Sequence, residues 1–355
     1  MYARNFKLQF KDLLENTYLP SNASLDETIA VWNKINNLLF KNIPSKLFRF
    51  RKYNIFNISS FEKGSISMCV ADQFSDKYDS YVFVDKKSIR EKIEDAKNSP
   101  ILAALIELVN SFGLQNTFYV FKDREDTTIS DTEFFYQLKK EKNLDSLFNS
   151  VSSIIDAQIN YIRKDKLTKI ACFTEDITSK FMWDMYADGY KGYALEYDFT
   201  QFHLSGCTAC NQRNKCQQCN YSSLYPVIYS EKRYNATNPI ENLVVRTILR
   251  QYGISMLPTF PDMLYWYKVY LYKDKDEYLH ECEWRIISRC EASQHEIFSE
   301  IPDLGCLKAI YYGPCIEEDH KNKLRTIAKQ KKLKEYDVGI NDETSDYKLR
   351  IFPIE

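Results

Sequence analysis

The stretch LTKIACFTEDITSKFMWDMYADGYKGYALEYDF, residues 167–199, decides the fold class. Its opening segment, LTKIACFTE, has the short apolar run of a strand. A helix is expected through KFMWDMYADGY, and a second strand follows in GYALEYDF. Strands separated by irregular helical segments, without a regular βαβ alternation, are typical of the α+β class.

Other strands are expected before and after this stretch. KLFRFRKY (46–53) alternates apolar and basic residues like a half-buried strand, and SISMCVA (65–71) follows a short helix that Gly64 would end. Later strands are expected near YPVIY (225–229), EWRIISRC (283–290), LKAIYYG (307–313) and DYKLRIFPI (346–354). These segments predict an α+β protein with a mixed or antiparallel sheet at its core.

Helices are expected at the N-terminus and between the strands. Ser24 precedes Glu27 by three residues, the capping-box pattern, so one helix is expected over residues 24–41. Further helices are expected at residues 1–18, through most of 85–163, twice within about 239–273, and at 317–334. We therefore divide the chain into an N-terminal helical segment, residues 1–45, and a core domain, residues 46–355, that contains a helical insertion.

The composition excludes several classes of protein. The chain has 355 residues, 27% of them charged, and a net charge of -1, so no global field attracts nucleic acid or an anionic membrane. The charged N-terminal segment lacks the pattern of a signal peptide, and no run of about 18 apolar residues occurs. We expect a cytoplasmic protein with no membrane partner.

Four cysteines form the strongest chemical signal in the sequence. Cys207, Cys210, Cys216 and Cys219 have the spacing C-x2-C-x5-C-x2-C. Two such hooks can bring four thiolates around one tetrahedral ion, and the loop at residues 203–222 offers almost no apolar surroundings that would bury them otherwise. We expect a structural zinc site, because protein sulfur fills all four coordination positions; an iron–sulfur cluster is the alternative.

Several specific motifs follow one another along the chain. They are KLFRFRKY, FSDKYD (74–79), ACFTED with FMWDMYADGYKGYALEYDF, LYPVIY, HECEWRII and LKAIYYGPC. This series, from about residue 46 to 315, resembles the bacterial family called domain of unknown function 2971. The sequence departs from the family pattern at Ser75, at Thr174 and in the four-cysteine loop, which is inserted after the ALEYDF strand. The family name states no activity.

A second pattern consists of a basic residue on a first strand, a hydroxyl residue closing a middle strand, and E-x-E opening a late strand. This layout resembles that of ADP-ribosyltransferases, which use NAD as co-substrate. The resemblance implies that Arg49, with Arg51 as its substitute, anchors NAD and that Thr174 is the orienting hydroxyl. It also implies that Glu283 is the catalytic carboxylate and that Glu281, two residues back on the same strand face, contacts the acceptor.

These roles agree with the chemistry of ADP-ribosyl transfer. Cleavage of the bond between nicotinamide and ribose creates an oxocarbenium-like centre that a carboxylate stabilises, and an arginine suits the diphosphate. Tyr186 is a candidate contact for the cofactor, although it and Trp183, three residues apart on a helix, are expected mainly in the core. The acceptor would be a protein or a nucleic acid, and the setting a bacterial toxin or a phage-defence effector.

Other interpretations of the same residues stay open. Arg285 shares the face of the glutamates, so a structural salt bridge is the alternative to catalysis, while Trp284 is expected to pack on the opposite face. A metal-dependent nuclease would use Asp76, Asp79, Glu281 and Glu283 as magnesium ligands, with the basic helix KNKLRTIAKQKKLK on phosphates. A non-enzymatic protein would use the zinc loop and aromatic side chains to recognise a partner protein.

Overall fold

The computed structural model describes residues 2–94, 99–101, 103–104, 144–200, 223–251, 257–289, 296–343, 345 and 347–354. Its α-helices are α1 (Tyr2–Glu15), α2 (Leu25–Phe40), α3 (Ile55–Lys63), α4 (Lys86–Glu94), α7 (Leu144–Lys164), α8 (Lys180–Tyr186), α9 (Thr237–Gln251), α10 (Tyr265–Lys268), α11 (Lys275–Tyr278) and α12 (Glu318–Gln330). Short 3-10 helices are η1 (Ala71–Gln73) and η4 (Leu279–Glu281). Its strands are β1 (Leu47–Arg51), β2 (Ser65–Cys69), β3 (Thr168–Thr174), β4 (Tyr193–Tyr197), β5 (Ser223–Pro226), β6 (Ile228–Ser230), β7 (Tyr272–Asp274), β8 (Glu283–Arg289), β9 (Phe298–Pro302), β10 (Leu307–Tyr312), β11 (Lys334–Ile340) and β12 (Leu349–Pro353).

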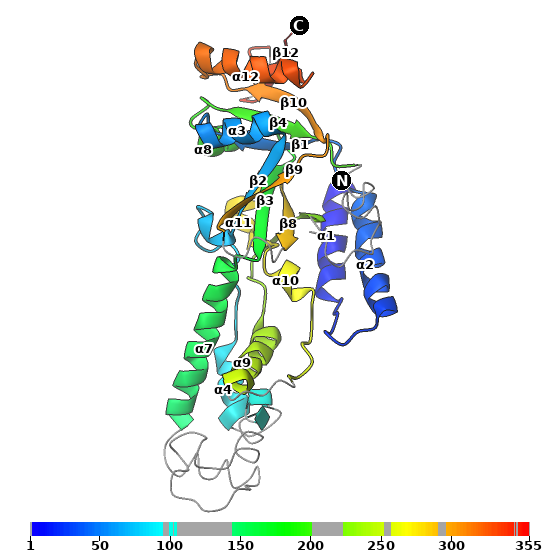
Figure 1. Cartoon of the computed structure of the whole chain (residues 1–355), viewed down its shortest axis with the longest axis vertical. Coiled ribbons are helices and arrows are strands. Elements are labelled where there is room, and N and C mark those ends of the chain that lie inside the picture. The colour runs from blue at the N-terminus through cyan, green and yellow to red at the C-terminus, as the bar shows by residue number, and fades with distance from the viewer. Residues whose placement is uncertain are drawn as a thin grey trace, which may run out of the picture.

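Ten of the described strands form one mixed sheet (Figure 1). Neighbouring strands follow the order β12-β11-β10-β4-β1-β3-β2-β9. Two further strands lie off this path: β8 pairs with β3, and β5 pairs with β8. The pairs are antiparallel except β10 with β11, the two parallel strands that α12 connects. β6 and β7 form a separate parallel pair. The expected α+β class with a mixed sheet is confirmed.

β1 and β2 diverge along one edge of β3. All seven residues of β3 pair with β8, from Thr168 opposite Arg289 to Thr174 opposite Glu283, so β8 occupies one edge of β3 throughout. On the other edge, β2 pairs with β3 at Ile170, and β1 pairs with it at Thr174. We call the divergence between β1 and β2 the fork. One branch continues into β4 and β10, and the other into β9 (Figure 1).

The two N-terminal helices pack beside the sheet. The expected capping box is present, since the Ser24 hydroxyl accepts the Glu27 N–H and the Glu27 carboxylate accepts the Ser24 N–H. Phe6 of α1 stacks on Trp284 of β8 with ring centroids 6.0 Å apart. The contact between Phe6 and Trp284 joins α1 to the part of the sheet that contains β8, beside which α1 lies in Figure 1.

Gly64 decides how α3 turns into β2. It ends the helix with a left-handed backbone, φ 68°, and its N–H donates to the Phe61 carbonyl at 3.2 Å. β2 then begins at the next residue, Ser65. The helix end and the strand after it are therefore as the sequence predicted, because a single glycine supplies the backbone conformation that other residues rarely adopt.

Three strands, β7, β9 and β11, lie where the sequence predicted helix or loop. β11 has one buried residue, Val338, and β9 has none, although exposed and half-buried residues alternate along β9. β7 is three residues long and falls at the end of a segment predicted as helical. Of the predicted insertion at about 85–163, α4 and α7 are helical as expected, and residues 105–143 lie outside the described part of the chain.

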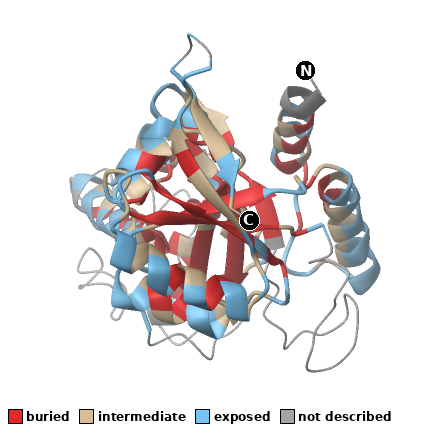
Figure 2. Ribbon diagram, turned by 90° about the horizontal axis from the view of Figure 1, so that it is seen from above, coloured by how far each residue is buried: buried red, intermediate tan, exposed pale blue. Residues whose placement is uncertain are grey.

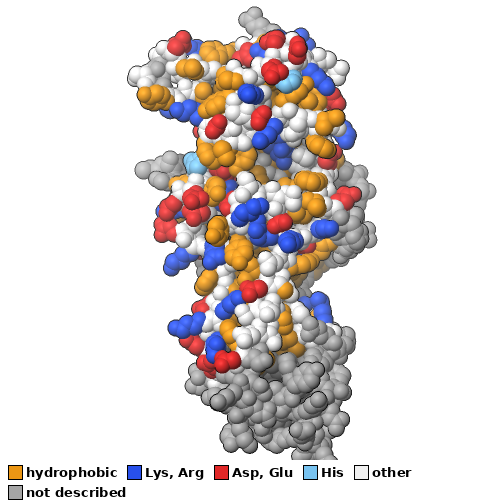
Figure 3. All heavy atoms as spheres, turned by 90° about the vertical axis from the view of Figure 1, so that its left-hand side faces the viewer, with side chains coloured by type: hydrophobic (Ala, Val, Ile, Leu, Met, Phe, Trp, Pro, Cys, Tyr) orange, Lys and Arg blue, Asp and Glu red, His pale blue; other side chains and the backbone are white. Residues whose placement is uncertain are grey.

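Buried residues concentrate in the strands at the centre of the molecule, and the surrounding helices expose their outer faces (Figure 2). On the face shown in Figure 3, acidic, basic and apolar side chains are mixed over the described surface, in agreement with the net charge of -1. In the described part of the chain, no helix has the length and apolar character needed to cross a bilayer.

Candidate functional site

A cluster of charged side chains is buried where β8 begins. It consists of Asp79, Lys273, Glu281, Glu283 and Arg285, and we call these five residues the charge cluster. Their exposed fractions range from 0% for Arg285 to 8% for Lys273. Because charged groups lose hydration when they are buried, such a cluster is stable only when its members are paired and hydrogen-bonded.

Arg285 lies at the centre of the charge cluster. Its guanidinium donates to both carboxylate oxygens of Asp79, at 2.9 and 2.5 Å, and to both oxygens of Glu283, at 2.8 and 3.1 Å. A further N–H donates to the Tyr270 carbonyl at 2.7 Å. All five N–H groups of the arginine are thus used. The predicted salt bridge between Arg285 and a glutamate is present.

Lys273 joins the two glutamates. Its amino group lies 2.5 Å from a Glu281 carboxylate oxygen and 3.1 Å from a Glu283 carboxylate oxygen. Tyr229, opposite Lys273 in the β6–β7 pair, accepts the Glu283 N–H at its hydroxyl at 2.7 Å. Three carboxylates and two cations give the charge cluster a formal net charge of 2 − 3 = −1.

The backbone at Cys282 brings both glutamates to Lys273. Glu281 ends the 3-10 helix η4, Cys282 has a left-handed backbone with φ 45°, and β8 begins at Glu283. The expectation that Glu281 lies on the strand face two residues before Glu283 is therefore wrong. A turn at Cys282 replaces the extended backbone, and the two carboxylates converge on one amino group.

The ionisation of the cluster follows from these contacts. Burial alone would raise the pKa of Glu283, but Arg285 and Lys273 lower it to about 2, so Glu283 is ionised at neutral pH. The hydroxyl of Tyr186 donates to Glu281 at 3.0 Å. Burial and the charge of Glu281 raise the pKa of Tyr186, which therefore stays protonated and able to donate.

Arg49 and Arg51 extend from β1 into the fork. Arg49 is 9% exposed and donates to the Ser67 carbonyl of β2 at 2.6 Å, and Arg51 donates to the Ser67 hydroxyl at 2.9 Å. Nη1 of Arg49 is buried without a hydrogen-bond partner. We call these two residues the arginine pair.

The arginine pair differs from the charge cluster because it lacks a compensating anion. Within the described residues, neither Arg49 nor Arg51 forms an ion pair, and the groups that raise the pKa of either arginine are tyrosines and cysteines. Burial lowers the pKa of Arg49 to about 9, with the charge of Arg51 as the second cause. The buried Arg49 beside a second cation, the half-buried Arg51, is unfavourable without a carboxylate unless an anion joins them.

Cys69 and Cys172 lie between the arginine pair and the charge cluster. Cys172 is opposite Arg285 in the β3–β8 pair, and its thiol donates to the Glu283 carboxylate. Burial raises the pKa of the Cys69 thiol, on which the arginine pair acts together with Arg285 and Asp79. Both groups of charges are therefore close enough to act on the same thiols.

Thr174 closes β3, as expected, but its hydroxyl does not contact a carboxylate. It donates to the main-chain carbonyl of Glu281 at 2.6 Å and accepts the Asp176 N–H at 3.2 Å. Thr174 lies directly opposite Glu283 in the β3–β8 pair. Its contribution to the site is thus to fix the backbone on which Glu281 and Glu283 are carried.

The segment of residues 167–199 forms part of the surroundings of the site. Trp183 is fully buried and donates its indole N–H to the Ile177 carbonyl at 2.7 Å, which confirms its expected place in the core. Trp284 is buried as well, and its indole donates to Glu175 at 2.7 Å, in agreement with the expected packing role. Tyr186 reaches the charge cluster from α8, in addition to Cys172 and Thr174 on β3.

Sequence reasoning missed Lys273, Tyr229 and the two cysteines of the fork. Lys273 follows the apolar segment VYLY, and a lysine in such surroundings is the one signal that could have indicated a buried ion pair. Nothing in a strand sequence tells which charged residue will lie opposite Cys172 on the neighbouring strand.

The predicted metal sites have different outcomes. Cys207, Cys210, Cys216 and Cys219 lie outside the described residues. Asp79, Glu281 and Glu283 are occupied by Arg285 and Lys273, and Asp76 accepts the Tyr78 N–H at 2.8 Å. Among the described residues there is no group of three or more histidine, cysteine or carboxylate side chains placed to hold a metal. This arrangement does not favour magnesium at the predicted carboxylates.

Comparison with known proteins agrees with the first of the two resemblances over part of its length. Residues 182–286 match the family described as Protein of unknown function (DUF2971). The DUF2971 match includes Tyr186 and, in the charge cluster, all members except Asp79. No curated protein and no solved structure matches the chain. The comparisons therefore give the ADP-ribosyltransferase layout no support of their own.

Proposed function

We propose that the chain transfers ADP-ribose from NAD to a macromolecular acceptor, either a protein or a nucleic acid. The order of the strands supports this function. Arg49 on β1, Thr174 on β3 and Glu283 on β8 lie on three neighbouring strands, because β3 pairs with both β1 and β8. An arginine, a hydroxyl and a carboxylate on adjacent strands are what the transferase layout requires.

The distribution of charge is the observation that carries the proposal. The arginine pair, made of the buried Arg49 and the half-buried Arg51, has no carboxylate partner in the described part of the chain, and the charge cluster beside it has a net negative charge. NAD has the complementary polarity, since its diphosphate is anionic and its nicotinamide ring is cationic. The diphosphate on the arginine pair and the nicotinamide riboside at the charge cluster would compensate both.

The residues of the charge cluster suit the bond changes of the reaction. The bond between the nicotinamide nitrogen and ribose C1′ breaks, and its electron pair leaves with neutral nicotinamide. The acceptor nucleophile forms a bond with the oxocarbenium-like C1′ and loses its proton. Glu283 stays ionised and stabilises the positive charge, while Glu281, oriented by Tyr186, accepts the proton.

Such an activity suits a bacterial toxin or a phage-defence effector, which acts on macromolecules of the host or of the phage. The four cysteines then hold a structural zinc ion and take no part in the transfer, because a four-thiolate site has no open coordination position.

NAD labelled in its adenylate phosphate tests the proposal. Wild-type protein incubated with cell extract should release nicotinamide and move the label to protein or nucleic acid. Glu283→Gln should reduce both signals by about a hundredfold or more, whereas Glu300→Gln, the same change on β9, should retain them. Wild-type protein that neither releases nicotinamide nor labels an acceptor would refute the proposal. Magnesium-dependent cleavage of nucleic acid in a parallel assay would replace it with the nuclease function.

A further inference from the structure

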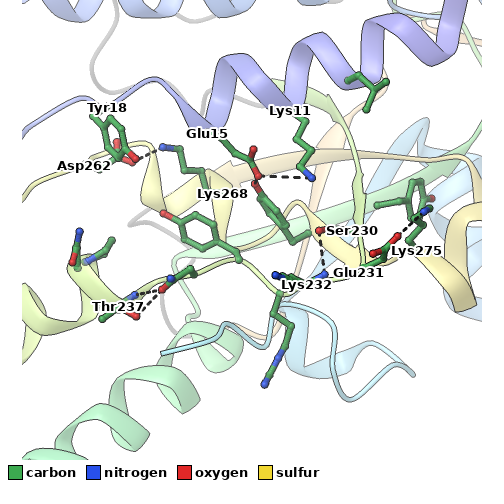
Figure 4. Close-up of a pocket in the computed structure, with 18 of the residues that line it drawn as sticks. Lys11, Glu15, Tyr18, Ser230, Glu231, Lys232, Thr237, Asp262, Lys268 and Lys275 are labelled. Carbon is green, nitrogen blue, oxygen red and sulfur yellow. Dashed lines mark hydrogen bonds and ion pairs between the residues drawn. The ribbon is translucent and has the colours of Figure 1, made fainter. Parts of the chain in front are cut away.

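A pocket of about 870 Å³ lies away from the fork, between α1 and the segment from β6 to the start of α9 (Figure 4). Its volume falls within the range of sites that bind small molecules or single nucleotides. None of the residues that line it belongs to the arginine pair or the charge cluster. Tyr229 connects the pocket with the charge cluster, because it lines the pocket and its hydroxyl accepts the Glu283 N–H.

Tyrosine side chains form one part of the pocket wall. Tyr18, Tyr234 and Tyr272 line it, and the rings of Tyr234 and Tyr272 lie 5.4 Å apart. Tyr18 is 65% exposed, with the amino group of Lys268 4.6 Å from its ring centroid. An exposed aromatic face beside a cation is the kind of surface on which a nucleic-acid base stacks.

Basic side chains exceed acidic ones in the pocket. Five basic and three acidic residues line it, and each acidic residue pairs with one lysine at N–O distances of 2.6 to 3.9 Å. The two basic residues left over, Lys232 and Arg233, are exposed and form no ion pair within the described part of the chain. The guanidinium of Arg233 lies 5.5 Å from the ring centroid of Tyr81.

We propose that this pocket binds a nucleotide unit of a single-stranded nucleic acid. The base stacks on the exposed face of Tyr18, and the phosphates contact Lys232 and Arg233. Because neither Lys232 nor Arg233 forms an ion pair within the described part of the chain, phosphate binding breaks no salt bridge of the pocket. The inference does not rest on transferase activity, because it uses the volume, the tyrosines and the excess positive charge of the pocket alone.

Fluorescence anisotropy with a labelled single-stranded oligonucleotide tests this inference on the whole chain. The double variant Lys232→Ala/Arg233→Ala should weaken binding at least tenfold. It should also lower the slope of log affinity against log salt by about 1.4, because each phosphate contact on a single strand contributes about 0.7. Tyr18→Ala should weaken binding by about tenfold with the salt slope unchanged. The matched control Lys34→Ala/Lys41→Ala removes the same charge from α2 and the residue that caps its end, outside the pocket.

A free nucleoside monophosphate forms the second arm of the experiment. Binding of the oligonucleotide or of the monophosphate, weakened by the pocket variants and not by the α2 control, supports the nucleotide site, and the comparison of affinities tells which source occupies it. Absence of binding to both probes would overturn the inference. An equal loss in the α2 control would overturn it too, because that result indicates attraction by net charge. Circular dichroism spectra of the variants establish that they are folded.

Discussion

Arg285 on β8 and Asp79 after η1 are 206 residues apart in sequence, and they form two parallel N–H···O bonds of 2.9 and 2.5 Å in the interior. Both side chains are almost completely buried. This contact ties the loop before α4 to the strand that carries Glu283. The removal of one partner leaves the other charge buried without compensation, which gives the pair its effect on stability.

We predict that Arg285→Met lowers the free energy of unfolding by about 3–5 kcal/mol, because Asp79 and Glu283 lose their main partner. Urea unfolding followed by circular dichroism measures the change. The control Arg90→Met removes both ion pairs of an arginine that is 41% exposed, and it should lower the stability much less. Equal effects of the two substitutions would contradict the special role of the buried pair.

The pH dependence of stability should report the ionised state of Glu283. Its folded-state pKa is lowered to about 2 from the ordinary 4.5, so the stabilisation is fully present above pH 4.5 and is lost as the pH falls towards 2. The difference in unfolding free energy between wild type and Glu283→Gln should therefore shrink across this interval. A difference that stays constant from pH 7 to pH 2.5 would show that the ion pairs of Glu283 do not depress its pKa.

The arginine pair should make the protein responsive to diphosphate ligands. ADP-ribose at about 100 times its dissociation constant should stabilise the wild type by about 2.7 kcal/mol, measured as a rise in the midpoint of thermal unfolding. Arg49→Met should remove this rise, since it deletes the buried guanidinium whose Nη1 has no partner. Arg350→Met on β12 is the matched control and should keep the full response. An Arg49→Met protein that responds like the wild type would exclude the fork as the ligand site.

The two glutamates should differ in the step that they affect. Glu283→Gln should lower kcat about a hundredfold and leave NAD binding nearly unchanged, because the lost charge acts on the transition state. Glu281→Gln should lower transfer to the acceptor more than it lowers release of nicotinamide, because Glu281 is assigned to the proton of the acceptor. Steady-state measurement of nicotinamide and of labelled acceptor separates the two effects. If activity per folded molecule is unchanged in both variants, the carboxylates are structural ion-pair partners only.

The cysteine loop should contain one zinc ion for each chain. Elemental analysis of purified protein should find zinc rather than iron, and Cys210→Ser should lower the bound metal. Because all four ligands lie between residues 207 and 219, removal of the metal by a chelator should leave the cooperative unfolding of the core in place. Protein purified without chelator that contains no metal would refute this prediction.

The sequence by itself determined the local elements of this protein. The alternation in KLFRFRKY predicted β1, Ser24 and Glu27 predicted the start of α2, and Gly64 predicted the end of α3. Each of these signals acts within a few residues, through backbone conformation or a nearby hydrogen bond. The sequence also indicated the ion pair of Arg285 with a glutamate, because the two residues lie on one strand face.

Only the tertiary structure decided which strands share an edge and which charges meet. The pairing of β3 with β8, β1 and β2 uses main-chain groups that every sequence offers, so no residue pattern specified the fork that receives Arg49. Asp79 reaches Arg285 from 206 residues away, and Lys273 on β7 reaches Glu281 and Glu283 across α11 and η4. Their contacts depend on the close packing of several elements at once. A buried charge needs a partner of opposite charge, but the sequence does not specify which residue that partner will be.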